Sequence, residues 1–132
     1  MFKGAATPVM TPLNVQQEID YNATEKVIEF LIGHKMDALL FLGSCGEFFA
    51  FSDKEKRDYI RFVCHRVRGR VPVLIGTGGT DIRQVTALTR YPYLLSTDTA
   101  DWQFHHSCFH ECRTAGHYGV PAILYRMQPE SS

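Results

Sequence analysis

The chain has 132 residues, of which 45% are hydrophobic and 21% are charged, so it can bury the core of one domain at most. Its 14 basic residues balance its 14 acidic residues, and this zero formal net charge argues against a nucleic-acid partner or a polybasic membrane surface. No apolar run approaches the roughly 20 residues that a membrane-spanning helix requires, so we expect no membrane partner.

The first part of the chain predicts a helix followed by a buried strand. Asp20 or Asn22 can cap a helix over residues 20–34. The apolar stripe of this helix consists of Val27, Ile28, Leu31 and Ile32. Residues 37–42 form a short apolar run, which is typical of a strand that is covered on both faces.

A second helix begins at a capping-box pattern. The Ser52 hydroxyl can accept the backbone N–H of Glu55, while the Glu55 carboxylate accepts the backbone N–H of Ser52. We expect this helix to run to about Arg68, with Gly69 as its stop.

The succession of strand and helix then repeats. Residues 71–75 predict a second buried strand, and Thr80 or Asp81 can cap a third helix that extends to Arg90. The two strands begin 34 residues apart, which is the length of one strand–helix unit. Repeated units of this size indicate a parallel α/β sheet or barrel.

A glycine-rich loop follows each of the two strands. Residues 43–47 read Gly-Ser-Cys-Gly-Glu, and residues 76–80 read Gly-Thr-Gly-Gly-Thr. Such loops bring backbone N–H groups and hydroxyls close to a ligand, which suits a carboxylate or a phosphate. The second loop lacks the lysine of a phosphate-binding loop, so we interpret it as part of a barrel mouth. We therefore expect the active face at the carboxyl ends of the strands.

The pattern of strands and helices is lost in the C-terminal part of the chain, and it returns only with a strand-like run at residues 120–125. We divide the chain into strand–helix units over residues 1–90 and a divergent or frameshifted segment over residues 91–132. A cluster there has the residue types of zinc ligands but no recognised spacing, so we expect loop residues and no metal site. It consists of His105, His106, Cys108, His110, Cys112 and His117.

The N-terminus and the cysteines predict a cytoplasmic location. Residues 1–12 contain one lysine and two prolines but no sustained apolar segment, unlike a signal peptide. The spacing of the four cysteines suggests no disulfide scaffold, and reduced thiols are the default in the cytoplasm.

Four segments, in order, resemble the dihydrodipicolinate synthase/N-acetylneuraminate lyase family of class I aldolases. They are residues 4–12 (GAATPVMTP), 37–47 (DALLFLGSCGE), 52–56 (SDKEK) and 70–80 (RVPVLIGTGGT). The second and fourth segments are most similar to the branch of 2-keto-3-deoxy-sugar-acid aldolases. The resemblance implies an incomplete (β/α)8 barrel, roughly its N-terminal half with parallel strands. It also implies a lyase family that condenses or cleaves pyruvate and other 2-keto acids through a lysine Schiff base, without a cofactor.

The resemblance further implies a substrate-binding loop. In the family, the two residues after the first glycine of the loop bind the pyruvate carboxylate. Here these residues are Ser44 and Cys45, which lie between Gly43 and Gly46. Where the second position is a threonine, its hydroxyl also belongs to a proton relay. A thiol is a poorer hydrogen-bond donor than a hydroxyl, so Cys45 is expected to keep carboxylate binding but to weaken the relay.

Tyr125 resembles the proton-shuttling tyrosine of the family. Residues 121–129 (PAILYRMQP) are similar to the motif that carries this tyrosine, with Arg126 where asparagine is usual. The spacing departs from the family, because Gly76 and Tyr125 are 49 residues apart and two further strand–helix units need about 68.

The chain offers no lysine for the Schiff base. Its lysines are Lys3, Lys26, Lys35, Lys54 and Lys56. The last two lie in the first turns of a helix, where an amine is solvated rather than desolvated as imine chemistry requires. An eight-stranded barrel takes roughly 250 residues, so we expect a truncated aldolase that is inactive alone. The alternative is a non-catalytic, ligand-binding or self-associating fragment with exposed sheet edges.

Overall fold

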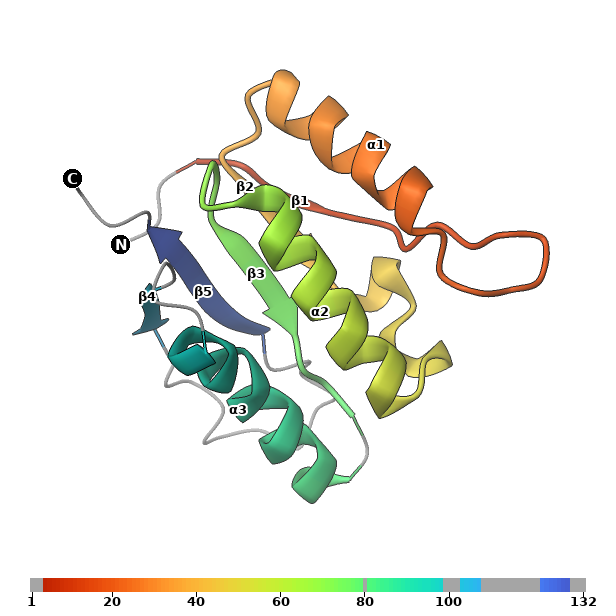
Figure 1. Ribbon diagram of the computed structural model, residues 1–132, viewed down its shortest axis with the longest axis vertical. Coiled ribbons are helices and arrows are strands. Elements are labelled where there is room, and N and C mark those ends of the chain that lie inside the picture. The colour runs from red at the N-terminus through yellow and green to blue at the C-terminus, as the bar shows by residue number, and fades with distance from the viewer. Residues whose placement is uncertain (1–3, 80, 99–102, 108–121, 129–132) are drawn as a thin grey trace.

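The computed structural model describes residues 4–79, 81–98, 103–107 and 122–128. Within these residues the strands form one sheet in the order β1-β2-β3-β5-β4, with the helices on one of its faces (Figure 1). The strands are β1 (Ala6–Pro8), β2 (Ala38–Phe41), β3 (Val73–Gly76), β4 (Gln103–Ser107) and β5 (Ala122–Gln128). The helices are α1 (Tyr21–Gly33), α2 (Asp53–Val67) and α3 (Ile82–Asp98), with the 3₁₀ turns η1 (Ser44–Gly46) and η2 (Phe48–Ala50).

Strands β1, β2 and β3 are parallel, which confirms the prediction from the repeated strand–helix pattern. Thr7 is opposite Leu39 in the register of β1 and β2, and Leu39 is opposite Val73 in that of β2 and β3. Parallel neighbours need a crossover connection, and α1 and α2 supply the two crossovers. The carboxyl ends of these strands therefore meet at one edge of the sheet.

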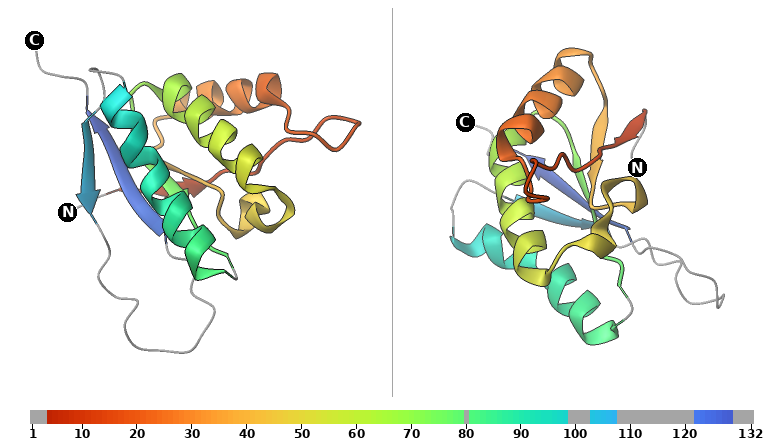
Figure 2. Two further views of the ribbon diagram at one scale, coloured as in Figure 1. Left: turned by 60° about the horizontal axis from the view of Figure 1, so that its bottom comes forward. Right: turned by 90° about the vertical axis from the view of Figure 1, so that its right-hand side faces the viewer.

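The hydrophobic core lies between the sheet and the helices. The fully buried strand residues of this core are Leu39, Phe41, Val73 and Ile75. Leu40 and Leu74 are opposite each other in the register and are only half-buried. Figure 2 shows that the described helices lie on one side of the sheet. The strand predicted at residues 37–42 is β2, and its expected cover on both faces is incomplete at Leu40, whereas Ala38 on the same face is fully buried. In a closed barrel, side chains of the opposite strands fill this inner face.

Local sequence signals position the starts of the first two long helices. Asp20, rather than Asn22, caps α1, because its carboxylate accepts the backbone N–H of Ala23 at 2.9 Å. The capping box of α2 is confirmed. The Ser52 hydroxyl accepts the backbone N–H of Glu55 at 3.3 Å, and the Glu55 carboxylate accepts the backbone N–H of Ser52 at 2.8 Å.

Local sequence signals also mark the end of α2 and the start of α3. Arg68 ends α2 in the left-handed conformation, with φ 50°, and Gly69 follows it with φ 69°. The Asp81 carboxylate accepts the backbone N–H of Arg83 at 2.9 Å, so Asp81 caps α3 as predicted.

Helix α3 is longer than the sequence pattern indicates. It continues to Asp98, so the predicted end at Arg90 is wrong. Leu88 is buried and Tyr91 packs against the core, so tertiary contacts hold α3 up to the point where its sequence pattern fades.

Strand β5 corresponds to the strand predicted at residues 120–125, but it runs in the opposite direction to β3. The register places Tyr125 opposite Val73 and Ala122 opposite Gly76. Strand β4 is antiparallel to β5 in turn. The prediction of parallel strands is thus confirmed for β1 to β3, and β4 and β5 differ from it. An antiparallel pair needs no helical crossover, and the described residues place no helix between β4 and β5.

Candidate functional site

The loop after β2 is a tight turn at the carboxyl edge of the parallel strands. It contains η1, and Gly43 precedes η1 as its N-cap. The N–H of Gly46 donates to the carbonyl of Gly43 at 3.0 Å, and the N–H of Glu47 donates to the carbonyl of Ser44 at 3.1 Å. We call residues 43–47 the strand-end turn. It brings together the four predicted substrate-binding residues.

Two residues in the left-handed conformation bracket the strand-end turn. Leu42 has φ 53° and Glu47 has φ 52°. This conformation costs roughly 1–2 kcal/mol for a residue with a side chain. Such strain persists where the surrounding structure enforces it, and it is concentrated at binding and catalytic sites. The Leu42 side chain is fully buried, so the core holds this strained residue in place.

The loop after β3 contacts the strand-end turn through its glycine backbone. A Cβ atom on Gly76 would lie only 2.1 Å from the carbonyl oxygen of Leu42. Only glycine permits this approach, which brings the carboxyl ends of β2 and β3 together. The loop is also joined to α3, because the Thr89 hydroxyl donates to the hydroxyl of buried Thr77 at 2.9 Å.

Thr11, which follows β1, holds the strand-end turn from the other side. Its buried hydroxyl donates to the carbonyl of Gly46 at 2.9 Å. A Cβ atom on Gly46 would lie 3.2 Å from the carbonyl oxygen of Val9, so the chain after β1 packs closely on this glycine. The sequence analysis did not single out Thr11, although it lies in the segment 4–12 that carries the family resemblance.

Ser44 and Cys45 are the exposed residues of η1. Within the described part of the chain, their N–H groups make no backbone hydrogen bond, because they precede the donors that close the turn. Among the described residues, the turn thus offers two N–H groups without a backbone partner, together with the hydroxyl and the thiol of two exposed residues, at the edge where three strands end. This set can accept a small anionic group, and a carboxylate matches it in size and hydrogen-bonding capacity.

The backbone of Tyr125 lies at a different level of the sheet from this edge. It lies opposite Val73 at the start of β3, whereas Gly76 marks the end of β3 next to the strand-end turn. Three residues of strand correspond to about 10 Å along the sheet. The structure therefore brings Gly43, Ser44 and Cys45 together but leaves Tyr125 apart from them.

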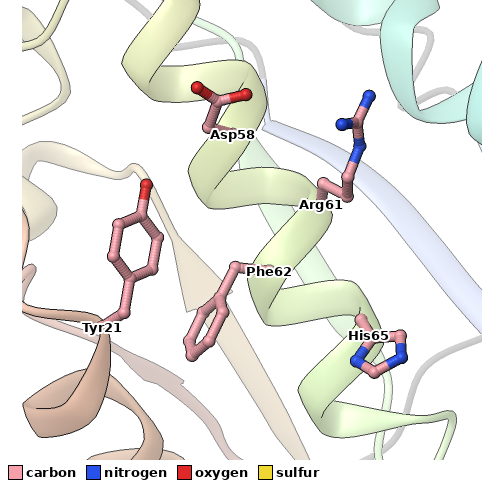
Figure 3. Close-up of a pocket in the computed structure, with 5 residues that line it drawn as sticks. All are labelled: Tyr21, Asp58, Arg61, Phe62 and His65. Atoms are coloured by element: carbon pink, nitrogen blue, oxygen red, sulfur yellow. The ribbon is translucent and has the colours of Figure 1, made fainter.

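A surface cavity of about 480 Å³ lies between α1 and α2, away from the strand ends. Its lining residues are Tyr21, Asp58, Arg61, Phe62 and His65. Figure 3 shows Tyr21 and Phe62 on one side of α2, whereas Arg61 and His65 point to the other side. The rings of Tyr21 and Phe62 pack edge to face, 4.9 Å apart. The charged groups do not converge on one point, so we assign no chemistry to this cavity.

The histidine and cysteine cluster is only partly within the described residues. His105 and His106 lie in β4, and the other four members lie outside the described ranges. Among the residues that are described, no three His, Cys, Asp or Glu side chains come together as metal ligands. The same residues contain no helix that is long and apolar enough to cross a membrane.

The sequence model of the dihydrodipicolinate synthetase family matches residues 1–100. The chain is 37% identical over 98 residues to a 4-hydroxy-tetrahydrodipicolinate synthase from Kosmotoga olearia, which covers 74% of this chain and 33% of that protein. A second such synthase, from Alkaliphilus oremlandii, is 32% identical over 135 residues, which covers 96% of this chain and 46% of that protein. The chain therefore spans between a third and a half of these curated relatives.

The fold is also similar to solved structures of this family. The structure of Escherichia coli YagE in complex with pyruvate superposes with a TM-score of 0.69 at 38% identity, over 71% of this chain and 32% of YagE. YagE is described as a putative 2-dehydro-3-deoxy-D-gluconate aldolase. At 96% coverage, the alignment with the Alkaliphilus protein extends well into residues 91–132.

Proposed function

Because the chain belongs to the dihydrodipicolinate synthetase family, we propose that it is the N-terminal part of a pyruvate-dependent aldolase barrel. In this proposal the chain contributes the site for the carboxylate of pyruvate or another 2-keto acid. The strand-end turn carries the proposal, since two of its N–H groups have no backbone partner within the described residues and lie at the carboxyl edge of parallel strands. The pyruvate complex of a 38% identical relative is consistent with this ligand.

The proposed roles divide among the residues of the turn. The N–H groups of Ser44 and Cys45 and the Ser44 hydroxyl would donate to the carboxylate, while the buried Gly46 lets the chain after β1 pack closely against the turn. The Cys45 thiol would contact the ligand as a weak donor. A proton relay through this position would be less effective than one through a hydroxyl.

The 132-residue chain alone is proposed to be inactive as an aldolase. Lys54 donates a hydrogen bond to Asp58 at 2.7 Å, which raises the pKa of Lys54 and keeps its amine protonated. Lys56 lies over the Phe48 ring, 5.8 Å from its centroid, on the outer helix layer. Neither amine has the desolvated setting in which a lysine becomes a nucleophile. The remaining barrel strands would have to supply the Schiff-base lysine and a tyrosine in the family position, since Tyr125 lies away from the turn.

Two measurements on the purified chain test this proposal. Nuclear magnetic resonance (NMR) titration with pyruvate should shift the backbone amides of residues 43–46, whereas sodium chloride at equal ionic strength should not. Ser44→Ala should weaken the titration without changing the fold. Borohydride reduction in the presence of pyruvate should leave the mass of the chain unchanged. A covalent pyruvate adduct would overturn the proposed inactivity, and unshifted turn amides would overturn the proposed carboxylate site.

A second candidate is a non-catalytic fragment that associates through its sheet. Within the described residues, β1 has β2 as its only neighbour, and Leu40 and Leu74 are half-buried on the face without helices. Unpaired strand edges and partly exposed apolar faces favour association. Sedimentation equilibrium should detect a stable dimer if this candidate is correct, and a monomer at all concentrations would exclude it. A cytoplasmic location stays a prediction from the sequence.

A further inference from the structure

Thr77 is a buried residue in the loop after β3 that the proposed carboxylate site does not use. Its side chain is fully buried, although the loop lies at the carboxyl edge of the sheet. The hydroxyl of Thr89 in α3 donates a hydrogen bond of 2.9 Å to the Thr77 hydroxyl oxygen. The Thr77 hydroxyl is therefore bonded within the fold rather than offered to a ligand.

A glycine further along the same loop also packs on α3. A Cβ atom on Gly79 would lie 3.2 Å from the Cγ2 atom of Val85, which is a tight approach. Val85 lies in the first turn of α3, where its N–H donates to the carbonyl of Asp81 at 3.0 Å. Val85 and Thr89 are four positions apart, so they share one face of the helix. The loop thus rests on that face of α3 through two contacts.

The other end of the loop touches the strand-end turn through backbone atoms. A Cβ atom on Gly76, directly before Thr77, would lie 2.1 Å from the Leu42 carbonyl oxygen and 3.2 Å from the Gly43 nitrogen. The Gly43 carbonyl in turn accepts the N–H of Gly46 at 3.0 Å. Closely packed backbone transmits strain. A shift of the loop on α3 is therefore expected to disturb the hydrogen bond that closes the turn.

We propose that Thr89 is a positioning residue for the strand-end turn. It acts through Thr77, because the bond between their hydroxyls holds the loop on α3, and Gly76 then sets the place of Gly43. A hydrogen bond weakens steeply outside a narrow range of lengths and angles, so a buried one fixes position as well as adding stability. The relevance of Thr89 to ligand binding rests on the proposed carboxylate site, whereas its effect on the turn does not.

Hydrogen exchange at the turn tests the inference. Thr89→Val removes the donor hydroxyl and keeps a branched side chain of similar size. We expect exchange of the Gly46 amide to speed up by about threefold to tenfold relative to the core amides of Ile60 and Val63. This exchange ratio separates an effect on the turn from a general loss of stability.

Two further variants keep the exchange test specific. Thr89→Ser retains the hydroxyl and should restore the exchange ratio of the unmodified chain. Thr7→Val is the matched control, since the Thr7 hydroxyl donates to the Met36 sulfur at 2.8 Å and lies in β1 rather than in α3. It should leave the ratio unchanged. The inference is overturned if Thr89→Val leaves the ratio unchanged, or if Thr89→Ser or Thr7→Val raises it as much as Thr89→Val does.

A double-mutant cycle tests whether Thr89 acts through Thr77. Thr77→Val should raise the same exchange ratio, because it removes the acceptor of the bond. Thr89→Val should add little in that background, since the bond is already absent. Fully additive effects of the two substitutions would show that Thr89 acts by another route, and they would overturn the inference.

Pyruvate titration of Thr89→Val separates the two proposals. If the variant raises the exchange ratio and also weakens the pyruvate-induced shifts, both proposals hold. If it raises the ratio while the unmodified chain shows no pyruvate-induced shift, the carboxylate site fails and the positioning of the turn by Thr89 stands. If pyruvate shifts the turn amides and Thr89→Val changes neither the ratio nor the titration, the positioning role fails alone.

Discussion

Gly76 and Leu42 approach each other so closely that a Cβ atom on Gly76 would lie 2.1 Å from the Leu42 carbonyl oxygen. Gly76 ends β3, Leu42 directly follows the end of the adjacent strand β2, and the two residues stand 34 positions apart in the sequence. Leu42 has φ 53°, so the same contact holds a strained residue at the entrance to the strand-end turn. Two backbone segments in contact cannot move aside as a flexible side chain can, so position 76 requires glycine.

Replacing Gly76 by alanine should destabilise the fold by about 1–3 kcal/mol, because the added methyl group must push two strands apart. Gly33→Ala is the matched control, since a Cβ atom at Gly33 meets nothing within 4 Å. Urea unfolding followed by circular dichroism measures both changes. Equal stability of the two variants would contradict the importance of the close contact.

Thr11→Val should leave the Gly46 carbonyl without its buried donor, at a cost of about 1–3 kcal/mol in unfolding free energy. It should also weaken the pyruvate-induced NMR shifts of the strand-end turn. Thr11→Ser keeps the hydroxyl and is expected to retain most of the stability and most of the pyruvate-induced shifts. A Thr11→Ser variant as impaired as Thr11→Val would assign the effect to packing rather than to the hydrogen bond.

Ser52→Ala should remove the N-cap of α2 and lower the free energy of unfolding by about 1 kcal/mol. The Ser52 hydrogen bonds also lower the pKa of Glu55, so the NMR titration midpoint of Glu55 should rise in this variant. Asn22→Ala is the control, because Asp20 and not Asn22 caps α1. An unchanged Glu55 midpoint would contradict the capping box.

The pairing of Glu29 with Arg70 should make stability depend on acid pH. Two hydrogen bonds, of 2.7 and 2.8 Å, join these residues, and they lower the pKa of Glu29 from 4.5. A lowered pKa in the folded state contributes stability above pH 4.5 that is lost as the pH falls through the folded value. Urea midpoints measured from neutral to acid pH should fall less steeply for Glu29→Gln. Identical pH profiles of the urea midpoint for the unmodified chain and Glu29→Gln would show that this exposed pair contributes nothing to stability.

The thiols of Cys45 and Cys64 should differ strongly in reactivity. Cys45 is exposed, whereas burial raises the pKa of Cys64 to about 12. Iodoacetamide at mildly alkaline pH should therefore modify Cys45 first, and Cys64 only in urea. Mass spectrometry of tryptic peptides separates these sites from Cys108 and Cys112. Pyruvate is expected to slow the modification of Cys45, and equal rates with and without pyruvate would count against the carboxylate site.

The origin of residues 91–132 stays a prediction as well. If a frameshift produced this segment, another reading frame of the coding DNA should continue with strand–helix units and a lysine-bearing strand.

Features that depend on near neighbours were predictable from the sequence. The capping box of α2 and the Asp81 cap of α3 involve residues two or three positions apart, so their chemistry is readable directly. The order of strands and helices over residues 20–90 follows from hydrophobic period and glycine position, and the motifs in residues 4–80 indicated the family. The short strand β1 was not predicted, because three residues give no recognisable period.

Only the tertiary structure decided how the strand-end turn is held and which residues surround it. Thr11 meets Gly46 across 35 positions, and Gly76 meets Leu42 across 34, so no local pattern could reveal either contact. The direction of β5 and the length of α3 also depend on tertiary contacts. Strand direction depends on which neighbour completes the hydrogen bonds, and helix length depends on burial against the core. Local elements and family membership could be read from short segments of the sequence. The arrangement of the site depends on the folded chain, because the site consists of segments that are far apart in sequence and come into contact only on folding.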